Sequence, residues 1–309
     1  MACPSCARFA LEGANMLDTV RLTVGVPEMS CGDLQRRGWD RTTCDNANGR
    51  FDVWSTCELD DVRLHFGDGF KWLTAETSIP KLMTGDNANL LSWDDCRRGM
   101  ARVREVACDA SGFGLPELDD WNVTRFDALW AWGVSPDAYI AALRFAKLPR
   151  TQARGYGSSV DWVTRGHRIR ARFYDKTAEV GDVVTLPARL ERQVRPRREV
   201  VRVGGERLGN STDDLGASSV KEILRDCMGQ LGLDKPIPSP LGVRSQLVDV
   251  HGRRRGSNLF RVLLESREYG TLPPYLSKQT QGRYRRLLAQ AGVRALSLDG
   301  ELPPLPMPE

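Results

Sequence analysis

Segment 167–176, HRIRARFYDK, alternates apolar and cationic side chains. No other pattern in the chain limits the possible local structure as strongly. Successive side chains of an extended strand point to opposite faces of a sheet. One face would carry Ile169, Ala171 and Phe173. The opposite face would carry a row of one tyrosine and four cations: Arg168, Arg170, Arg172, Tyr174 and Lys176. We therefore predict a strand with one apolar face and one charged face.

Other segments show either a strand-like alternation or the spacing of a helix. Strand patterns occur at 18–24, 51–56, 61–66, 69–78, 121–132, 155–163 and 184–194. Helical patterns occur at 90–110, 135–147, 218–232 and 276–293. The order strand, helix, strand, helix, strand, strand is what a ferredoxin-like or palm-type sheet requires. The sequence thus predicts an α+β fold with helices on one face of an antiparallel sheet, followed by a smaller, basic, mostly helical C-terminal module.

Charge is distributed unevenly along the chain. The formal net charge is +4, but residues 1–140 carry −8 and residues 141–309 carry +12. A basic half raises the expectation of a polyanionic partner, of which nucleic acid is the commonest. From composition and pattern we expect a disordered or mis-assigned start at 1–15, a catalytic domain at 16–195, a linker or mobile insertion at 196–218, a basic module at 219–295 and a disordered tail at 296–309.

The pattern of apolar residues argues against a membrane or secreted protein. The chain lacks an apolar run of about 18 residues, which a membrane span needs. It also lacks the cationic start and apolar stretch of a secretory signal. We therefore expect a cytoplasmic protein whose eight cysteines are reduced thiols. Met16 opens a well-formed strand pattern and is a candidate for the true start.

Tyr174, placed among cations, is a candidate nucleophile. A phenol has a reference pKa of about 10, and cations such as Arg172 and Lys176 favour its ionised form. The same cations would hold a DNA phosphate beside the oxygen. Attack on that phosphate would conserve bond energy in a phosphotyrosine, so that a strand is cut and rejoined without ATP. The alternative is a half-buried tyrosine whose hydroxyl is satisfied by hydrogen bonds.

Acidic residues would serve this chemistry by holding Mg²⁺ or Mn²⁺, which polarises a phosphate oxygen. The candidates are Asp127, Glu179 and Glu191. An ion pair with Arg189 or Arg192 accounts for Glu191 equally well. Asp127 lies on a strand that is otherwise poor in polar residues, so a buried charge there needs a partner or a metal.

Five segments occur in the order and approximate spacing of a known family: MLDTVRL at 16–22, TSIPKLMTGDN at 77–87, VTRFD at 123–127, FYDKTAE at 173–179 and ARLER at 188–192. Together they resemble the gene II/X type replication initiators of filamentous phages and related plasmids. The resemblance covers about residues 16–194 and is weaker beyond. In that family the tyrosine of a Y-x-K-x-x-E segment is the nicking nucleophile, which falls on Tyr174, with Lys176 and Glu179 matching its neighbours. Asp86 departs from the family, whose members commonly have a histidine there.

The resemblance implies a rolling-circle replication initiator, which is a metal-dependent, site-specific DNA endonuclease and strand transferase with a covalent 5′-phosphotyrosine. Its partners would be phage or plasmid origin DNA, both duplex and single-stranded, and the helicase and polymerase of a bacterial host. One alternative is a plasmid mobilisation relaxase, which would share the chemistry. Another is a non-catalytic DNA-binding repressor, in which Tyr174 serves packing.

The C-terminal module carries its own candidate DNA contacts. Ser277 is placed to cap a helix that presents Lys278, Arg283, Arg285 and Arg286. Arg253, Arg254 and Arg255 form a second cluster suited to phosphates. Arg168, Arg170 and Arg172 complete the predicted DNA-binding set. The alternative is a basic helix packed on the catalytic domain with its arginines in solvent.

Overall fold

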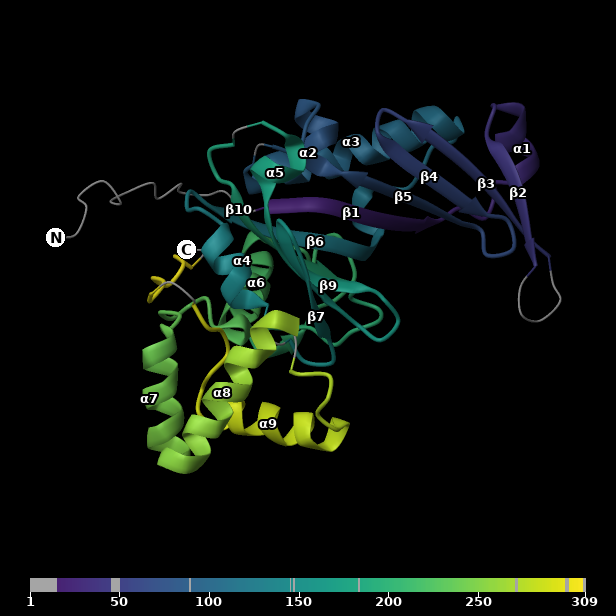
Figure 1. The fold of residues 1–309 in the computed structure, drawn as a ribbon. Helices are drawn as coiled ribbons and strands as arrows, with labels where there is room; N and C mark the ends of the chain where they lie inside the picture. The colour runs from purple at the N-terminus through teal and green to yellow at the C-terminus, as the bar shows by residue number, and fades with distance from the viewer. Residues whose placement is uncertain are drawn as a thin grey trace. The chain divides into compact units, whose positions relative to one another are not determined.

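The computed structural model describes residues 16–45, 51–88, 90–144, 146, 148–182, 184–269, 272–297 and 300–307. These residues form two compact units (Figure 1). The first unit comprises the described residues up to Ala128 together with Arg195–Lys221. The second comprises Leu129–Val194 and the described residues from Glu222 onward. The division falls within the segment 16–195, which the sequence predicts to be one catalytic domain.

The first unit is an antiparallel sheet covered by helices. Its strands are β1 (Met16–Gly25), β2 (Asp40–Asp45), β3 (Phe51–Leu59), β4 (Val62–Gly67), β5 (Trp72–Ser78) and the first part of β6 (Asn122–Trp132). Their order is β2-β3-β4-β5-β1-β6. Its helices are α1 (Cys31–Arg36), α2 (Ile79–Thr84) and α3 (Trp93–Ser111), with a short 3₁₀ helix at Leu118–Asp120.

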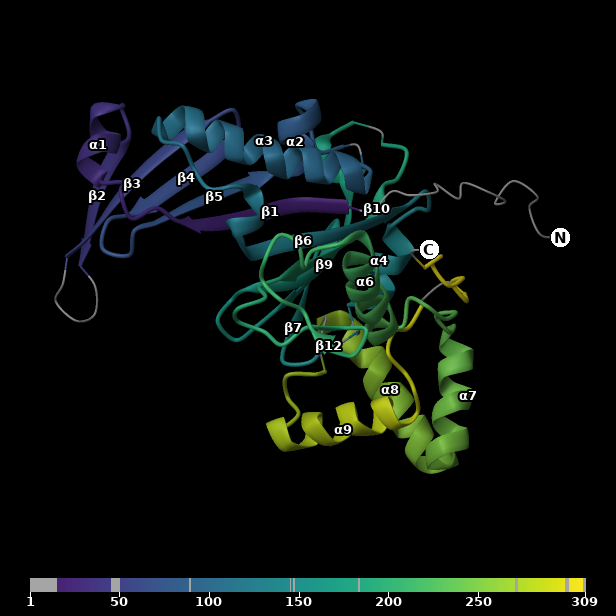
Figure 2. The same ribbon diagram turned by 180° about the vertical axis from the view of Figure 1, so that it is seen from behind.

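Helix α3 covers one face of this sheet, as Figures 1 and 2 both show. It packs against β1, β4 and β5. Ser92 caps its first turn, where the Ser92 hydroxyl accepts from the Asp95 amide and the Asp95 carboxylate accepts from the Ser92 amide. Gly112, at φ 68°, ends it. Register places Leu22, Leu64 and Ala75 side by side, and all three are fully buried, so this face of the sheet is the core face.

The strands of the second unit follow one another in the order β6-β10-β9-β8-β7, within the ten-stranded sheet that the described residues form. The strands that follow β6 are β7 (Gln152–Tyr156), β8 (Ser159–Val163), β9 (Ile169–Asp175) and β10 (Ala188–Val194). Helices α4 (Asp137–Leu143), α5 (Lys176–Val180) and α6 (Ala217–Leu231) accompany them. A two-stranded hairpin that belongs to the first unit, β11 (Arg202–Val203) with β12 (Glu206–Arg207), precedes α6.

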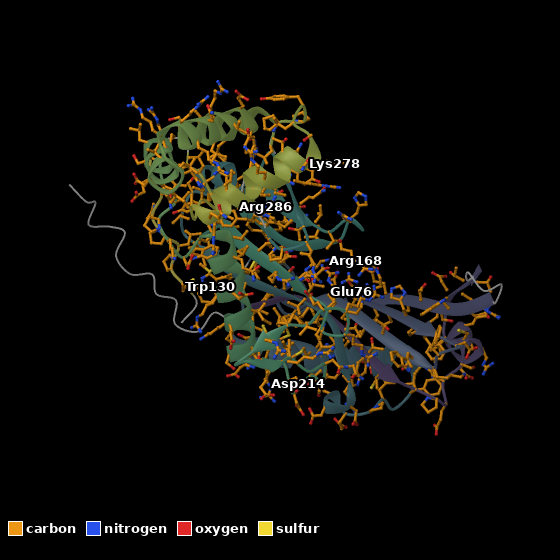
Figure 3. The ribbon with its side chains drawn as sticks, turned by 90° about the horizontal axis from the view of Figure 1, so that it is seen from below. Glu76, Trp130, Arg168, Asp214, Lys278 and Arg286 are labelled. Atoms are coloured by element: carbon orange, nitrogen blue, oxygen red, sulfur yellow. The ribbon has the colours of Figure 1, made fainter. Side chains whose placement is uncertain are left out.

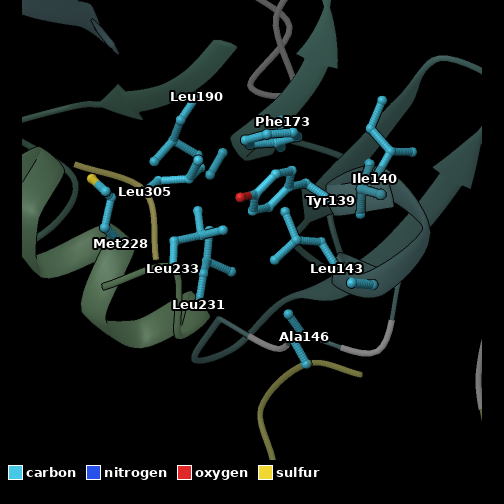
Figure 4. Packing of buried hydrophobic residues seen from close by; sticks show 14 of the residues in the cluster. Tyr139, Ile140, Leu143, Ala146, Phe173, Leu190, Met228, Leu231, Leu233 and Leu305 are labelled. Atoms are coloured by element: carbon cyan, nitrogen blue, oxygen red, sulfur yellow. The ribbon is translucent and has the colours of Figure 1, made fainter. Parts of the chain in front are cut away.

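Phe173 lies in the core of the second unit, on the apolar face of β9 (Figure 4). Its ring lies 6.1 Å from that of Trp132 and 6.3 Å from that of Tyr139, centroid to centroid. The same cluster contains Met228 and Leu231 of α6, together with Leu190 and Leu305. The predicted apolar face of segment 167–176 is therefore confirmed.

Three helices pack together at the C-terminal end of the second unit: α7 (Pro240–His251), α8 (Arg253–Tyr269) and α9 (Lys278–Gln290) (Figure 2). Their shared core contains Val243, Leu247, Leu259, Leu263 and Leu287. Gly252, at φ 76°, joins α7 directly to α8. As predicted, Ser277 caps α9, because its hydroxyl accepts from the Thr280 amide.

The structure confirms the α+β class and the antiparallel sheet, and it shows contacts made by the predicted linker and by the predicted tail. Segment 196–218 is bonded to the first unit, where the Val123 amide donates to the Asn210 carbonyl at 2.6 Å. In the tail, Leu305 is 2% exposed and belongs to the same core as Phe173. The Tyr139 hydroxyl also donates to the Pro303 carbonyl at 2.9 Å.

The two units repeat one order of elements. The first runs strand β1, helix α1, strands β2–β5 and then helices α2 and α3. The second runs strand β6, helix α4, strands β7–β10 and then helix α6, with α5 inserted before β10. Strand order within the two units also agrees, as β1-β5-β4-β3-β2 and β6-β10-β9-β8-β7. One topology is present twice in the chain.

Candidate functional site: the charged face of β9

Tyr174 lies on the face of β9 that points away from the Phe173 core. Its direct cross-strand neighbours are Ser159 on β8 and Arg189 on β10. The guanidinium carbon of Arg172 is 5.9 Å from the centre of the Tyr174 ring, within the range of a cation–π contact. Tyr174 is 6% exposed and Arg189 is 1% exposed, so both are buried.

Arg172 is held by an acid that the sequence analysis did not single out. Its Nε and Nη2 donate to the two carboxylate oxygens of Asp161 at 2.9 and 3.2 Å. This hydrogen bonding, with the charges of Asp161, Glu191 and Glu179, raises the pKa of Arg172. Asp161 is 4% exposed. A lone acid within the apolar strand VDWV is the sequence signal that would have indicated it.

The charged residues of this face form a row across four strands. Register places them side by side in the order Arg154, Asp161, Arg172, Glu191, from β7 to β10. Opposite charges that face one another across strands stabilise a sheet by about 0.2–1 kcal/mol for each pair. Glu191 thus lies beside Arg172 in register, and its charge contributes to the raised pKa of Arg172.

Lys176 does not continue the strand, which corrects the predicted row of cations. β9 ends at Asp175, whose carboxylate accepts from the Thr177 amide at 2.9 Å and so caps α5. Lys176 is the first residue of α5, and its Nζ donates to Glu179 at 2.6 Å. Lys176 is 1% exposed, whereas the Glu179 side chain is 44% exposed.

Asp127 belongs to the first unit, where it has a cationic partner. It is 1% exposed. Arg125 binds both of its carboxylate oxygens, through Nε at 3.1 Å and through Nη2. Arg125 also donates to Glu76 at 2.9 Å, and Glu76 accepts from Nε of Arg21 at 2.6 Å. The partner that a buried Asp127 needs is therefore an arginine, and the sequence analysis missed Glu76 and Arg21.

A metal site is not preformed around the predicted ligands. Within the residues that the structure describes, no three His, Cys, Asp or Glu side chains form a group suited to a metal ion. Asp127 is bound to Arg125, and Glu179 to Lys176. Asp86 serves a turn, since its carboxylate accepts from the Ala88 amide at 2.8 Å. These donors do not fit a bound cation without rearrangement, and we derive no chemical step through a metal.

The other predicted DNA contacts are solvent-facing. Arg168 and the basic residues of α8 and α9 are exposed: Arg253, Arg254, Arg255, Lys278, Arg283, Arg285 and Arg286. Figure 3 labels Arg168, Lys278 and Arg286 among the second unit's side chains. Arg170 is half-buried, and its carbonyl accepts from Arg192 at 3.0 Å. Exposure is compatible both with phosphate contacts and with arginines in solvent.

The first unit has an equivalent charged row, again in the order acid, arginine, glutamate: Glu58 on β3, Arg63 on β4 and Glu76 on β5. His65 lies two residues after Arg63, just as Tyr174 lies two residues after Arg172. It faces Thr56 and Thr74 across the strands. Burial, aided by Arg21 and Arg63, lowers the pKa of His65. Only the strand register reveals this correspondence.

Comparison with known proteins gives little. No family model matches the chain, and no curated protein matches it. Among solved structures, a rolling circle replication initiator protein from Geobacillus stearothermophilus is 11% identical and has a TM-score of 0.35, covering 70% of this chain and 84% of that one. The TBP of Methanococcus jannaschii is 10% identical, with a TM-score of 0.32, covering 70% of this chain and 94% of that one. Both TM-scores are too low to support an inference about this chain.

No helix within the described residues has the length and apolar character that crossing a membrane requires.

Proposed function

We propose that this chain is a rolling-circle replication initiator that nicks and rejoins one strand of origin DNA through Tyr174. The observation that carries the proposal is the setting of Tyr174 on β9. It pairs with Arg189 across the sheet and lies against the guanidinium of Arg172. The five segments shared with the phage and plasmid initiators support the same assignment.

In the proposed step, the phenolic oxygen of Tyr174 forms a bond to phosphorus, and the bond from phosphorus to the 3′ oxygen breaks. The phenol gives up its proton, and the departing 3′ oxygen gains one. Attack by that 3′ hydroxyl on the phosphotyrosine reverses the step and rejoins the strand. Arg172 and Arg189 supply positive charge where negative charge develops on the phosphate, which is the usual basis of such stabilisation.

The low exposure of Tyr174 is the observation that favours the second candidate, a non-catalytic DNA-binding repressor. At 6% exposure Tyr174 presents little of its surface to a DNA strand in this conformation. The nickase proposal therefore requires that DNA binding uncover Tyr174. A repressor requires no such change, because its tyrosine would only pack.

A divalent cation, Mg²⁺ or Mn²⁺, remains part of the proposal. Mg²⁺ is commonly bound by one or two carboxylates together with substrate phosphates. We assign that role to Glu191, which lies beside Arg172 in register, and to Glu179, which is paired with Lys176 in this structure. Such a cation would bind together with DNA and not to the protein alone.

The deciding experiment uses supercoiled DNA that carries the origin, with Mg²⁺ or Mn²⁺ present. The parent protein should convert it to open circles and form a covalent protein–DNA adduct, and a chelator should prevent both. Tyr174→Phe should abolish nicking and the adduct while origin binding persists. Tyr156→Phe, which removes the exposed tyrosine at the end of β7, is the matched control and should nick normally. Nicking by Tyr174→Phe at the parent rate would refute the assignment, and loss of nicking in Tyr156→Phe alone would move the nucleophile to Tyr156.

A further inference from the structure

Three aromatic side chains of the first unit are exposed or half-exposed at one end of its sheet. Phe70 is 60% exposed and Trp72 is 44% exposed, and Trp54 is half-buried. The rings of Trp54 and Phe70 lie 6.4 Å apart, centroid to centroid. Large aromatic side chains gathered in solvent normally mark a binding surface. The proposed nicking chemistry makes no use of them.

Strand register places the two tryptophans on one face, with glycines beside them. Trp54 on β3 pairs with Gly67 on β4, which pairs with Trp72 on β5, which pairs with Gly25 on β1. This face also carries Glu76, so it is the face opposite the α3 core. We call the row Trp54, Gly67, Trp72 and Gly25, together with Phe70, the aromatic platform.

The glycines leave space beside the tryptophan rings. A Cβ at Gly67 would lie 2.9 Å from the Trp54 ring, so no other residue fits beneath that indole without displacing it. A Cβ at Gly25 would meet nothing within 4 Å, which shows open space beside Trp72. The backbones of β3 and β5 are two strand spacings apart, about 9.5 Å. Trp72 is 44% exposed, so a flat ligand can reach it.

Positive charge lies directly beside the platform. The guanidinium carbon of Arg197 is 4.9 Å from the centre of the Trp72 ring. Arg197 and its neighbour Arg198 are exposed. Segment 195–207 contains five arginines and two glutamates. Cations that border exposed aromatic rings match a ligand with both negative charges and flat apolar faces.

We propose that the aromatic platform binds single-stranded nucleic acid, with bases stacked on Trp72 and Trp54 and phosphates at Arg197 and Arg198. Single-strand binding sites combine a cationic path for the backbone with aromatic side chains on which bases stack. Duplex DNA does not fit, because its bases are already stacked on one another. The inference rests on the proposed role in DNA replication, for which a nicked strand has to be held unpaired, but it requires no chemistry at Tyr174.

The test measures binding of a fluorescent oligo(dT) by anisotropy, without metal, so that nicking plays no part. Truncation of a stacking aromatic residue typically weakens binding roughly five-fold to 100-fold for each base. We expect Trp72→Ala and Trp54→Ala to show losses in this range. Trp72→Phe, which keeps a stacking ring, should stay within a few-fold of the parent, whereas Trp72→Leu, which is apolar but not flat, should behave as Trp72→Ala does.

Two further measurements separate stacking from charge. An abasic strand of the same length keeps the phosphates but lacks the bases, so Trp72→Ala should bind it as the parent does. Arg197→Ala should lower the salt-dependence slope of oligo(dT) binding by about 0.7. Leu241→Ala, at an exposed apolar residue of α7, is the control and should change nothing.

The proposal is overturned if the parent binds the abasic strand as tightly as oligo(dT), or if Trp72→Leu and Trp54→Ala bind oligo(dT) like the parent. Thermal unfolding of each variant identifies any that fail to fold, and Trp72→Phe supplies the comparison in that case. Tyr174→Phe should bind oligo(dT) normally. Failure of the nicking assay with normal oligo(dT) binding would therefore refute the proposed function and leave the platform standing.

Discussion

Single residues of this chain owe their roles to partners that are distant in sequence. Asp161 and Arg172 form a two-bonded ion pair on the charged face of β9, and the Asp161 side chain is only 6% exposed. Removing one member of such a pair leaves the other without its charge-assisted bonds. We expect Asp161→Asn to lower the free energy of unfolding by about 1–3 kcal/mol, because Asn cannot accept both guanidinium bonds. Urea unfolding measures the change.

The control is Glu105→Gln, which removes an ion pair of similar length on the surface. Arg102 and Glu105 lie 3.0 Å apart, with side chains 43% and 59% exposed. Exposed pairs contribute little, so this variant should stay within about 0.5 kcal/mol of the parent. Equal effects of the two substitutions would mean that the Asp161–Arg172 pair is solvated and does not position Arg172.

The alternation of segment 167–176 was sufficient to predict a strand and the burial of Phe173. The same pattern placed Lys176 wrongly, because alternation continues through a residue whose backbone is already helical and capped by Asp175. Asp161 and Glu76 were missed because cross-strand partners are fixed by register, which a single sequence does not display. The prolines of the tail suggested disorder, whereas the apolar residues among them, Leu302 and Leu305, pack on a core.

At the scale of elements, α7 and α8 approach so closely that one position admits only glycine. A Cβ at Gly256 would lie 2.5 Å from the carbonyl oxygen of Leu247, which is backbone and cannot turn aside. Gly256→Ala should therefore push the two helices apart and destabilise the three-helix cluster by about 1–3 kcal/mol. Thermal unfolding followed by circular dichroism is the measurement.

Gly282 provides the opposite case in α9. A Cβ there would meet nothing within 4 Å, and alanine favours a helix over glycine by about 1 kcal/mol. Gly282→Ala should therefore raise the midpoint of unfolding. If Gly256→Ala raised it as well, the close approach of α7 to α8 would be wrong.

At the scale of the whole molecule, the sequence and the structure suggest different boundaries for the smallest part that could nick DNA. All the candidate catalytic residues precede residue 195, which invites a truncation near residue 215 as a minimal nicking domain. The core around Phe173 also contains Cys227, Met228, Leu231 and Leu305, however, and all four are buried. A chain cut at residue 215 lacks these residues, so the second unit cannot close its core.

We expect the truncated chain to lose the protected structure of β8 to β10 and all nicking activity. Hydrogen exchange of the strand amides measures the first, and the origin assay measures the second. The full chain carrying Arg283→Ala, Arg285→Ala and Arg286→Ala is the control, because those side chains are exposed and it should keep its protection. A truncated chain that still nicks a single-stranded origin would show that the catalytic part is autonomous.

The repeated order of elements also bears on the history of the gene. Two units with one topology are the expected product of duplication and fusion of an ancestral segment that encoded a single unit. Duplicates diverge once one copy preserves the original role, and the residue two positions after the shared arginine differs between the copies, His65 in one and Tyr174 in the other. Superposing residues 16–111 on 122–231 should bring these two positions together, and a mismatch there would argue for convergence. Selection would then have acted on two inherited versions of one surface, allowing each to acquire its own specialisation.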